Sequence, residues 1–260
     1  MRNDLYPGRV AALVRPLLSR TRLSLGAALG ALMLSVAAPQ PAAAEGPVLV
    51  ELFTSQGCSS CPPADALIGE LAAEDDILPL SFHVDYWDYL GWRDTFAEAR
   101  FTDRQVSYRD AWGDRVVYTP QVVVAGVAPV VGSREGEVRT AIAGASAAPA
   151  PGRIEIIRRD GALVASLADL PKDSVLQVAV FDKAASVEIA RGENAGREMT
   201  YHHVVRDFMR IGSVAQTGRA LNLPEPMEGQ GVAIWAQEPD YGAVVATARY
   251  LAGGALAAAE

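Results

Sequence analysis

The stretch from Gln56 to Asp65, QGCSSCPPAD, constrains the fold of this chain more than any other feature. It holds the only two cysteines of the sequence, Cys58 and Cys61, and two prolines follow them at once. Proline is tolerated in the first turn of a helix, where the backbone N–H groups have no acceptor within the helix. The two prolines therefore predict a helix that begins at residue 62, with both cysteines at its N-terminus.

The sequence on either side of the cysteines predicts strands that alternate with helices. An apolar run at 48–53 (VLVELF) precedes them, and a second run at 77–84 (ILPLSFHV) follows the predicted helix. Such alternation favours an α/β domain with a mixed sheet. The same pattern continues with a helix at 95–112, strands at 121–125 and 130–131, and a helix at 135–143.

A change of composition predicts a second domain. The stretch 144–152 (GASAAPAPG) is small, Pro-rich and uncharged, which is typical of a linker. After it, β-rich runs follow at short spacing, and Asp160-Gly161 between RIEIIRR and ALVASL is typical of a hairpin turn. The sequence therefore predicts an α/β domain at 45–143 and a mostly antiparallel, sandwich-like all-β domain at 153–260.

The first 44 residues predict a secretory signal that is cleaved after Ala44. Five arginines come before an apolar run from Leu23 to Ala38, and the small residues 42–44 follow it. The run spans about 16 residues, fewer than the roughly 20 that cross a membrane. We therefore expect the remaining chain in the periplasm or outside the cell, where disulfides persist.

The charge balance argues against nucleic acid or an anionic membrane surface as a partner. The first 44 residues carry five Arg and one Asp, so that the remaining chain has 18 basic and 30 acidic residues, a net charge of −12. Binding to phosphate groups needs a cationic surface, which this composition does not favour.

Three kinds of chemistry are open to the cysteine pair: thiol–disulfide exchange, a structural disulfide and a metal site. The N-terminus of a helix stabilises a thiolate, which favours exchange. A bridge that closes four residues contributes roughly 2 kcal/mol in the loop-entropy model, against about 4.7 kcal/mol for a loop of 100 residues. Structural zinc takes four ligands, whereas this chain offers one cysteine pair and three histidines.

Four motifs taken together resemble a secreted bacterial family catalogued as a domain of unknown function, in which a thioredoxin-like half is joined to a β-rich half. The motifs are LFTSQGCSSCPPAD (52–65), HVDYWDYLGWRD (83–94), YTPQVVV (118–124) and RGENAGREMTYHHVVR (191–206). The resemblance implies an α/β thioredoxin-like fold for residues 45–143. It also implies that Cys58 is the attacking thiol, that Cys61 is the resolving thiol, and that Pro120 is a cis-proline opposite them.

Five further residues are candidates for the same site. Ser59 and Ser60 leave the cysteine pair uncrowded, and Thr119 precedes the expected cis-proline, so that these three are expected to contact a substrate. Trp87 forms either a substrate wall beside the cysteines or a loop packed on a satellite core. Glu51 lies in the first predicted strand, where thioredoxins place an acid that takes the proton of the resolving thiol. A glutamate that reaches solvent at the strand end is the other interpretation.

These observations predict an exported thiol–disulfide oxidoreductase or thiol relay. Its partners would be protein or small-molecule thiols and disulfides, with a redox partner that is itself exported, and no organic cofactor is needed. One alternative is a copper(I)-handling protein, because soft thiolates select that ion and His83 could join Cys58 and Cys61 as a third ligand. Another is a non-enzymatic periplasmic binding module in which the disulfide is structural.

Overall fold

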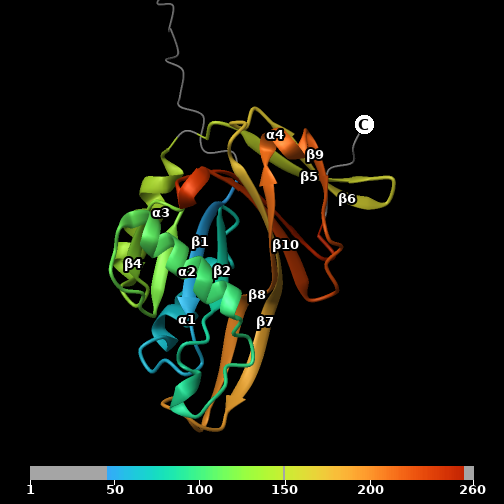
Figure 1. Cartoon of the computed structure of the whole chain (residues 1–260). Helices are drawn as coiled ribbons and strands as arrows, with labels where there is room; N and C mark the ends of the chain where they lie inside the picture. Colours follow the sequence, from blue (N-terminus) through green and yellow to red (C-terminus); the bar gives the residue numbers. More distant parts are fainter. Residues whose placement is uncertain (1–45, 149, 255–260) are drawn as a thin grey trace, which may run out of the picture. The chain divides into compact units, whose positions relative to one another are not determined.

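The computed structural model describes residues 46–148 and 150–254, so that the predicted signal at 1–44 lies outside the described residues. The elements up to residue 146 are β1 (Val48–Thr54), α1 (Pro62–Leu71), β2 (Ile77–His83), the 3-10 helix η1 (Asp88–Leu90), α2 (Ala99–Trp112), β3 (Gln121–Val124), β4 (Ala128–Val131) and α3 (Glu135–Ser146). The later elements are β5 (Arg153–Arg159), β6 (Ala162–Ala168), β7 (Val175–Ile189), β8 (Arg197–Ser213), α4 (Val214–Thr217), β9 (Ala220–Asn222), β10 (Gln230–Gln237), η2 (Pro239–Tyr241) and β11 (Val244–Leu251) (Figure 1).

The predicted fold class is wrong in one essential respect. The α/β half and the β-rich half are not a thioredoxin-like domain followed by a separate sandwich, because both contribute strands to one mixed sheet. Its eight strands lie in the order β11-β10-β7-β8-β2-β1-β3-β4, and a smaller sheet has the order β5-β6-β9. The two halves meet where β2 and β8 run parallel and pair at Ser81 and Val204.

The elements before residue 147 lie close to the positions that local sequence features predict. Helix α1 begins at Pro62 with Cys61 as its N-cap residue, which confirms the start that the two prolines predicted. β1 and β2 are buried along their whole length, as continuous apolar runs in a central parallel pair should be. Helix α2 ends at Gly113, whose φ of 69° is the left-handed conformation that commonly ends a helix.

In the β-rich half, one sequence prediction is confirmed and another is wrong. The hairpin at Asp160-Gly161 is confirmed, because both residues have positive φ and join β5 to the antiparallel β6. The runs VLQVAVF and SVEIAR were expected to be two strands, but they form the single strand β7. Together with β8 it makes a long antiparallel ribbon that continues past the end of β10 (Figure 1).

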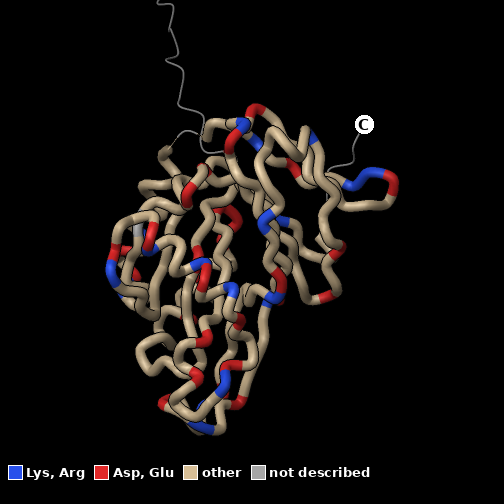
Figure 2. The backbone as a smooth tube through the Cα atoms, viewed as in Figure 1, with Lys and Arg blue, Asp and Glu red and all other residues tan. Residues whose placement is uncertain are grey.

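Three apolar clusters pack the two faces of the large sheet. On one face, alternate residues of β1 pack against α1 and α3. Leu52 of β1, Leu67 of α1 and Ile142 of α3 belong to this cluster. On the same strand, Leu49 and Phe53 point to the opposite face and join Phe101 and Tyr108 of α2. The third cluster lies between the small sheet and strands β7, β10 and β11. In the described chain, Lys and Arg are interspersed with Asp and Glu (Figure 2).

A buried polar network ties α2 to both halves of the large sheet. Arg104 of α2 donates to Glu51 of β1 at 2.6 Å and to Gln177 of β7 at 2.5 Å. Tyr108 donates to the second oxygen of Glu51 at 2.5 Å, and Gln237 of β10 donates to the Tyr108 hydroxyl at 3.0 Å. Because β2 and β8 lie between β1 and β7, this network spans the junction of the two halves.

Aromatic rings surround the guanidinium of this network. The Arg104 Cζ atom lies 5.0–5.6 Å from the ring centroids of Phe82, Tyr108, Phe208, Trp235 and Tyr241. Burial lowers the pKa of Arg104, but the charge of Glu51 outweighs it and holds the pKa above its ordinary value. Arg104 therefore stays charged in the core. Removal of either Arg104 or Glu51 would leave the other charge buried without its partner.

No helix within residues 46–148 and 150–254 has both the length and the apolar character to cross a membrane.

We expect Arg104→Ala to lower the free energy of unfolding by about 3–5 kcal/mol, because Glu51 would remain buried without its cation. Urea denaturation measures this loss. Arg109→Ala is the matched control on the same helix, since Arg109 pairs with the exposed Asp110, and it should cost less than about 1 kcal/mol. Equal losses in the two variants would show that the buried pair does not hold the halves together.

Candidate functional site

The two cysteines form a disulfide at the start of α1. The Cα atoms of Cys58 and Cys61 are 5.5 Å apart, and the backbone N–H of Cys61 donates to the carbonyl of Cys58. Both residues are buried, Cys58 at 1% and Cys61 at 0% exposure. The disulfide therefore lies at the helix start that the sequence predicts for the cysteine pair, and it is shielded from solvent.

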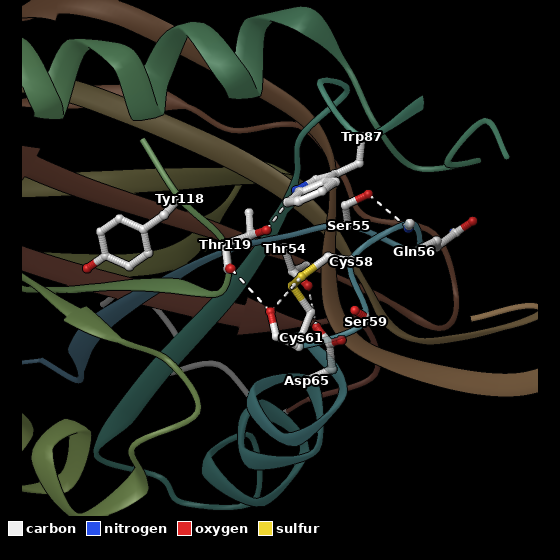
Figure 3. The surroundings of a disulfide bond; sticks show 12 residues. Thr54, Ser55, Gln56, Cys58, Ser59, Cys61, Asp65, Trp87, Tyr118 and Thr119 are labelled. Carbon is white, nitrogen blue, oxygen red and sulfur yellow. Dashed lines mark hydrogen bonds between the residues drawn. A yellow bond between two sulfur atoms is a disulfide. The ribbon is translucent and has the colours of Figure 1, made fainter. Parts of the chain in front are cut away.

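Residues on the loop before β3 face this disulfide across the site. The Thr119–Pro120 peptide bond is cis, as the resemblance implied. The indole Nε1 of Trp87 donates to the Thr119 hydroxyl at 2.8 Å, which joins the loop after β2 to the loop before β3. Figure 3 shows Trp87 and Thr119 on one side of the disulfide and Asp65 on the other.

The two serines between the cysteines are exposed, in contrast to their neighbours. The Ser60 hydroxyl lies 3.4 Å from Cys58 Sγ and 3.5 Å from the carbonyl oxygen of Thr119. The backbone N–H of Ser59 donates to a carboxylate oxygen of Glu193 at 3.3 Å. Ser59, Ser60, Thr119 and Trp87 thus lie near the disulfide, Trp87 also packs against the apolar core, and the contact of these residues with a substrate stays a prediction.

Gln56 connects the cysteine-bearing loop to the segment that follows η1. Its side-chain oxygen accepts from Trp92 Nε1 at 2.8 Å and from the backbone N–H of Thr95 at 3.2 Å. Its own backbone N–H donates to Asp94 at 2.7 Å. Because Gln56 is fully buried, these bonds fix the backbone that leads into the cysteine pair.

Asp65 is a buried acidic side chain near the disulfide. It lies one helical turn after Cys61, and its backbone N–H donates to the Cys61 carbonyl at 3.1 Å. Thr54 of β1 donates to Oδ1 of Asp65 at 2.7 Å, whereas Oδ2 is buried and has no partner among the described residues. Burial raises the pKa of Asp65 to about 7, which the bond from Thr54 offsets only in part.

A buried histidine–aspartate pair lies behind this carboxyl group. His83 Nδ1 and Asp94 Oδ2 are 2.8 Å apart, and both side chains are inaccessible to solvent. Burial raises the pKa of Asp94, but the charge and hydrogen bond of His83 and the N–H groups of Gln56 and Phe96 lower it overall. His83 Nε2 is buried without a partner in the described chain. The electrostatic interaction with His83 lowers the pKa of Asp65, and the interaction with Asp94 raises it.

The structure places Glu51 in a different environment from the one expected. Side chains alternate along a strand, so that Glu51 and Thr54 of β1 point to opposite faces of the sheet. Thr54 meets Asp65 of α1, whereas both oxygens of Glu51 are engaged by Arg104 and Tyr108 of α2. Glu51 is fully buried and does not reach solvent.

The residues that sequence reasoning missed are Gln56, Asp65, Asp94 and Asn194. Asp65 had a usable signal, because residues four apart share one face of a helix and Asp65 is four residues after Cys61. The other three reach the site from loops, and Asn194 comes from a position 136 residues beyond Cys58. All three stand within the motifs that carry the family resemblance, but no local pattern shows which side chains of those motifs reach the cysteines.

The metal interpretation finds no support in the described residues. No group of three or more His, Cys, Asp or Glu side chains within 46–148 and 150–254 is arranged to hold a metal ion. His83 is directed to Asp94 through Nδ1. The geometry therefore does not favour the copper(I) site considered from the sequence.

Comparisons with known proteins agree with this architecture. The model of a family described as protein of unknown function (DUF1223) matches residues 49–237. The crystal structure of a protein from Agrobacterium tumefaciens is similar with a TM-score of 0.70 and 27% identity, over 83% of this chain and 99% of that one. HBP35 of Porphyromonas gingivalis shares the fold with a TM-score of 0.54 and 15% identity, over 83% of this chain and 78% of that one. None of the curated proteins matches.

The raised pKa of Asp65 predicts a pH dependence of stability. Because the folded-state pKa lies above the unfolded value, the protonated carboxyl contributes stability that is complete below about pH 4 and is lost as the pH rises through about 7. We therefore expect Asp65→Asn to gain on the wild type by more than about 1.4 kcal/mol between pH 4.5 and 8. Urea denaturation at each pH measures the difference.

Glu70→Gln is the control for this pH series, since Glu70 is exposed on the same helix. Its curve should run parallel to that of the wild type. If the Asp65→Asn curve is parallel as well, the carboxyl group is ionised in the folded protein at acidic pH and the assigned pKa is wrong.

Proposed function

The chain belongs to the DUF1223 family, and we propose that it is an exported thiol–disulfide oxidoreductase or thiol relay. The observation that carries this proposal is the Cys58–Cys61 disulfide at the first turn of α1, with the protonatable carboxyl of Asp65 one turn later. A structural bridge between residues three apart would contribute less stability than a bridge that closes a long loop. A disulfide at a helix N-terminus, by contrast, is placed to stabilise a thiolate when it opens.

The exchange runs through a mixed disulfide. A partner thiolate attacks Cys58 Sγ, the bond between the two protein sulfurs breaks, and its electron pair goes to Cys61 Sγ, which takes a proton. A second partner thiolate then attacks the partner sulfur of the mixed disulfide and releases Cys58 as a thiolate. The partner loses two electrons and the protein gains two. The same steps in reverse reduce a partner disulfide.

Asp65 is suited to the proton transfer at Cys61. A group is an efficient proton donor or acceptor when its pKa lies near the working pH, and burial brings the pKa of Asp65 to about 7. It belongs to the first turn of α1 and lies next to Cys61 (Figure 3). We therefore assign the proton transfer at Cys61 to Asp65 and not to Glu51, whose two oxygens are engaged by Arg104 and Tyr108.

Access to Cys58 requires a local opening, because both cysteines are buried. Trp87 packs on the loop before the pair: a Cβ atom added to Gly57 would lie 3.1 Å from the Cβ of Trp87. The indole is held by its hydrogen bond to Thr119. We propose that this bond opens when a partner docks, so that the indole forms one wall of the substrate site.

The proposed compartment is the periplasm or the cell exterior. It follows from the predicted signal at 1–44, and it suits a chain whose cysteines form a disulfide. The partners would be other exported thiols and disulfides. The excess of acidic residues does not favour nucleic acid.

Cys61→Ser should trap a mixed disulfide with its partner, because Cys58 can still attack but no second thiol resolves the adduct. Non-reducing gel electrophoresis and mass spectrometry of adducts formed in a periplasmic extract measure this. Cys58→Ser is the matched control and should form far fewer adducts. A Cys61→Ser protein that forms no adducts beyond those of Cys58→Ser would contradict the proposed exchange.

Thr119→Val should speed the reduction of the disulfide by dithiothreitol about 2- to 10-fold, because it removes the acceptor that holds Trp87. That range corresponds to the 0.5–1.5 kcal/mol of roughly one hydrogen bond. The rate is measured by quenching with an alkylating agent. Thr140→Val, at an exposed position on α3, is the control and should leave the rate unchanged. An unchanged rate in Thr119→Val would show that the indole does not limit access.

A further inference from the structure

The turn between β7 and β8, residues 190–196, reaches the cysteine-bearing loop. β10 pairs with β7 as far as Asp182, and the pairing of β7 with β8 continues to Ile189. The ribbon therefore extends past β10 toward the end of the molecule where α1 begins (Figure 1). We call residues 190–196 the hairpin tip.

Asn194 anchors the hairpin tip on the disulfide loop. Its side-chain amide donates to the carbonyl oxygens of Gln56 at 3.0 Å and Cys58 at 2.9 Å, and the residue is 1% exposed. Arg197 donates to the side-chain oxygen of Asn194 at 3.2 Å, which fixes the orientation of the amide. Buried hydrogen bonds to two backbone carbonyls are costly to break, so the tip and the loop should move together.

The anchored tip delivers a carboxylate to the disulfide. Glu193, next to Asn194, accepts a hydrogen bond from the backbone N–H of Ser59, the residue that follows Cys58. A negative charge at this place opposes the favourable effect of the helix N-terminus on a Cys58 thiolate. The reduced protein is thereby destabilised relative to the disulfide.

We propose that the hairpin tip tunes the Cys58–Cys61 pair, with Asn194 as the anchor and Glu193 as the charge that favours the disulfide over the dithiol. This inference rests on the proposed function, because that function uses the redox equilibrium of the cysteine pair. In the half-reaction, the disulfide takes two electrons and one proton from a dithiol and becomes a Cys58 thiolate and a Cys61 thiol. Both Asn194 and Glu193 are positioning residues, because they act through the loop and the charge of Cys58.

The direct test is the reduction potential of Glu193→Gln, measured in graded dithiothreitol buffers by alkylation and mass. We expect the equilibrium constant to shift about 2- to 10-fold toward the reduced form, since a tenfold change corresponds to about 30 mV for two electrons. The pKa of the Cys58 thiol should fall in the same variant. Both differences should shrink in 1 M salt, because the carboxylate is exposed and its charge is then screened.

Glu198→Gln is the matched control for the charge. It removes the same charge from an exposed position at the start of β8, where Glu198 lies opposite Glu188. Its potential should equal that of the wild type within error. A shift of the same size in both variants would assign the effect to net charge and overturn the specific role of Glu193.

The anchor is tested with Asn194→Ala, alone and combined with Glu193→Gln. Without the anchor, Glu193 should no longer be held at Ser59, so that the potential shifts in the same direction and the second substitution adds little. A double-mutant cycle measures this coupling. Fully additive shifts would overturn the anchoring role, and circular dichroism checks that Asn194→Ala is folded.

The potential distinguishes this inference from the proposed function. A shifted potential in Glu193→Gln supports the tuning role even if Cys61→Ser traps no partner. An unshifted potential and thiol pKa in Glu193→Gln would overturn the tuning role even if the protein exchanges disulfides.

Discussion

The buried guanidinium of Arg104 is bonded to Glu51 of β1 and to Gln177 of β7, and it thereby ties helix α2 to both halves of the large sheet. The backbone junction between the two halves is short, because β2 and β8 pair at Ser81 and Val204. On the α2 face of the sheet, Arg104 reaches from Glu51 of β1 to Gln177 of β7 and thereby spans that junction. A charge in such a place is stable only when its partners surround it, so the network also specifies how α2 and the strands meet.

This joined sheet has a direct consequence for the disulfide. Because β7 and β8 belong to the same sheet as β1, their ribbon is held at a defined place relative to α1, and Asn194 can reach the carbonyls of Gln56 and Cys58. A freely linked β domain could not deliver one amide to that position. The β-rich half is therefore part of the environment of the cysteines.

Burial accounts for two properties of the site, the shielded cysteines and the raised pKa of Asp65. The same packing that covers Cys58 and Cys61 also removes Asp65 from water, and this raises the pKa of its carboxyl group. His83 and Asp94 are buried as well and are hydrogen-bonded to each other. Trp87 is held beside the site by its hydrogen bond to Thr119, and both of these residues lie outside the stretch 56–65 that carries the cysteines.

Local sequence patterns predicted the helix that starts at Pro62 and the hairpin at Asp160-Gly161, and they placed the two cysteines of the disulfide at the start of that helix. These depend on backbone preferences and spacing, which neighbouring residues record. Three features follow from the folded chain alone: the halves share one sheet, Glu51 faces α2 while Asp65 lies beside the cysteines, and Asn194 holds the disulfide loop. Strand pairing and buried polar contacts join residues far apart in the chain, and no local pattern carries that information.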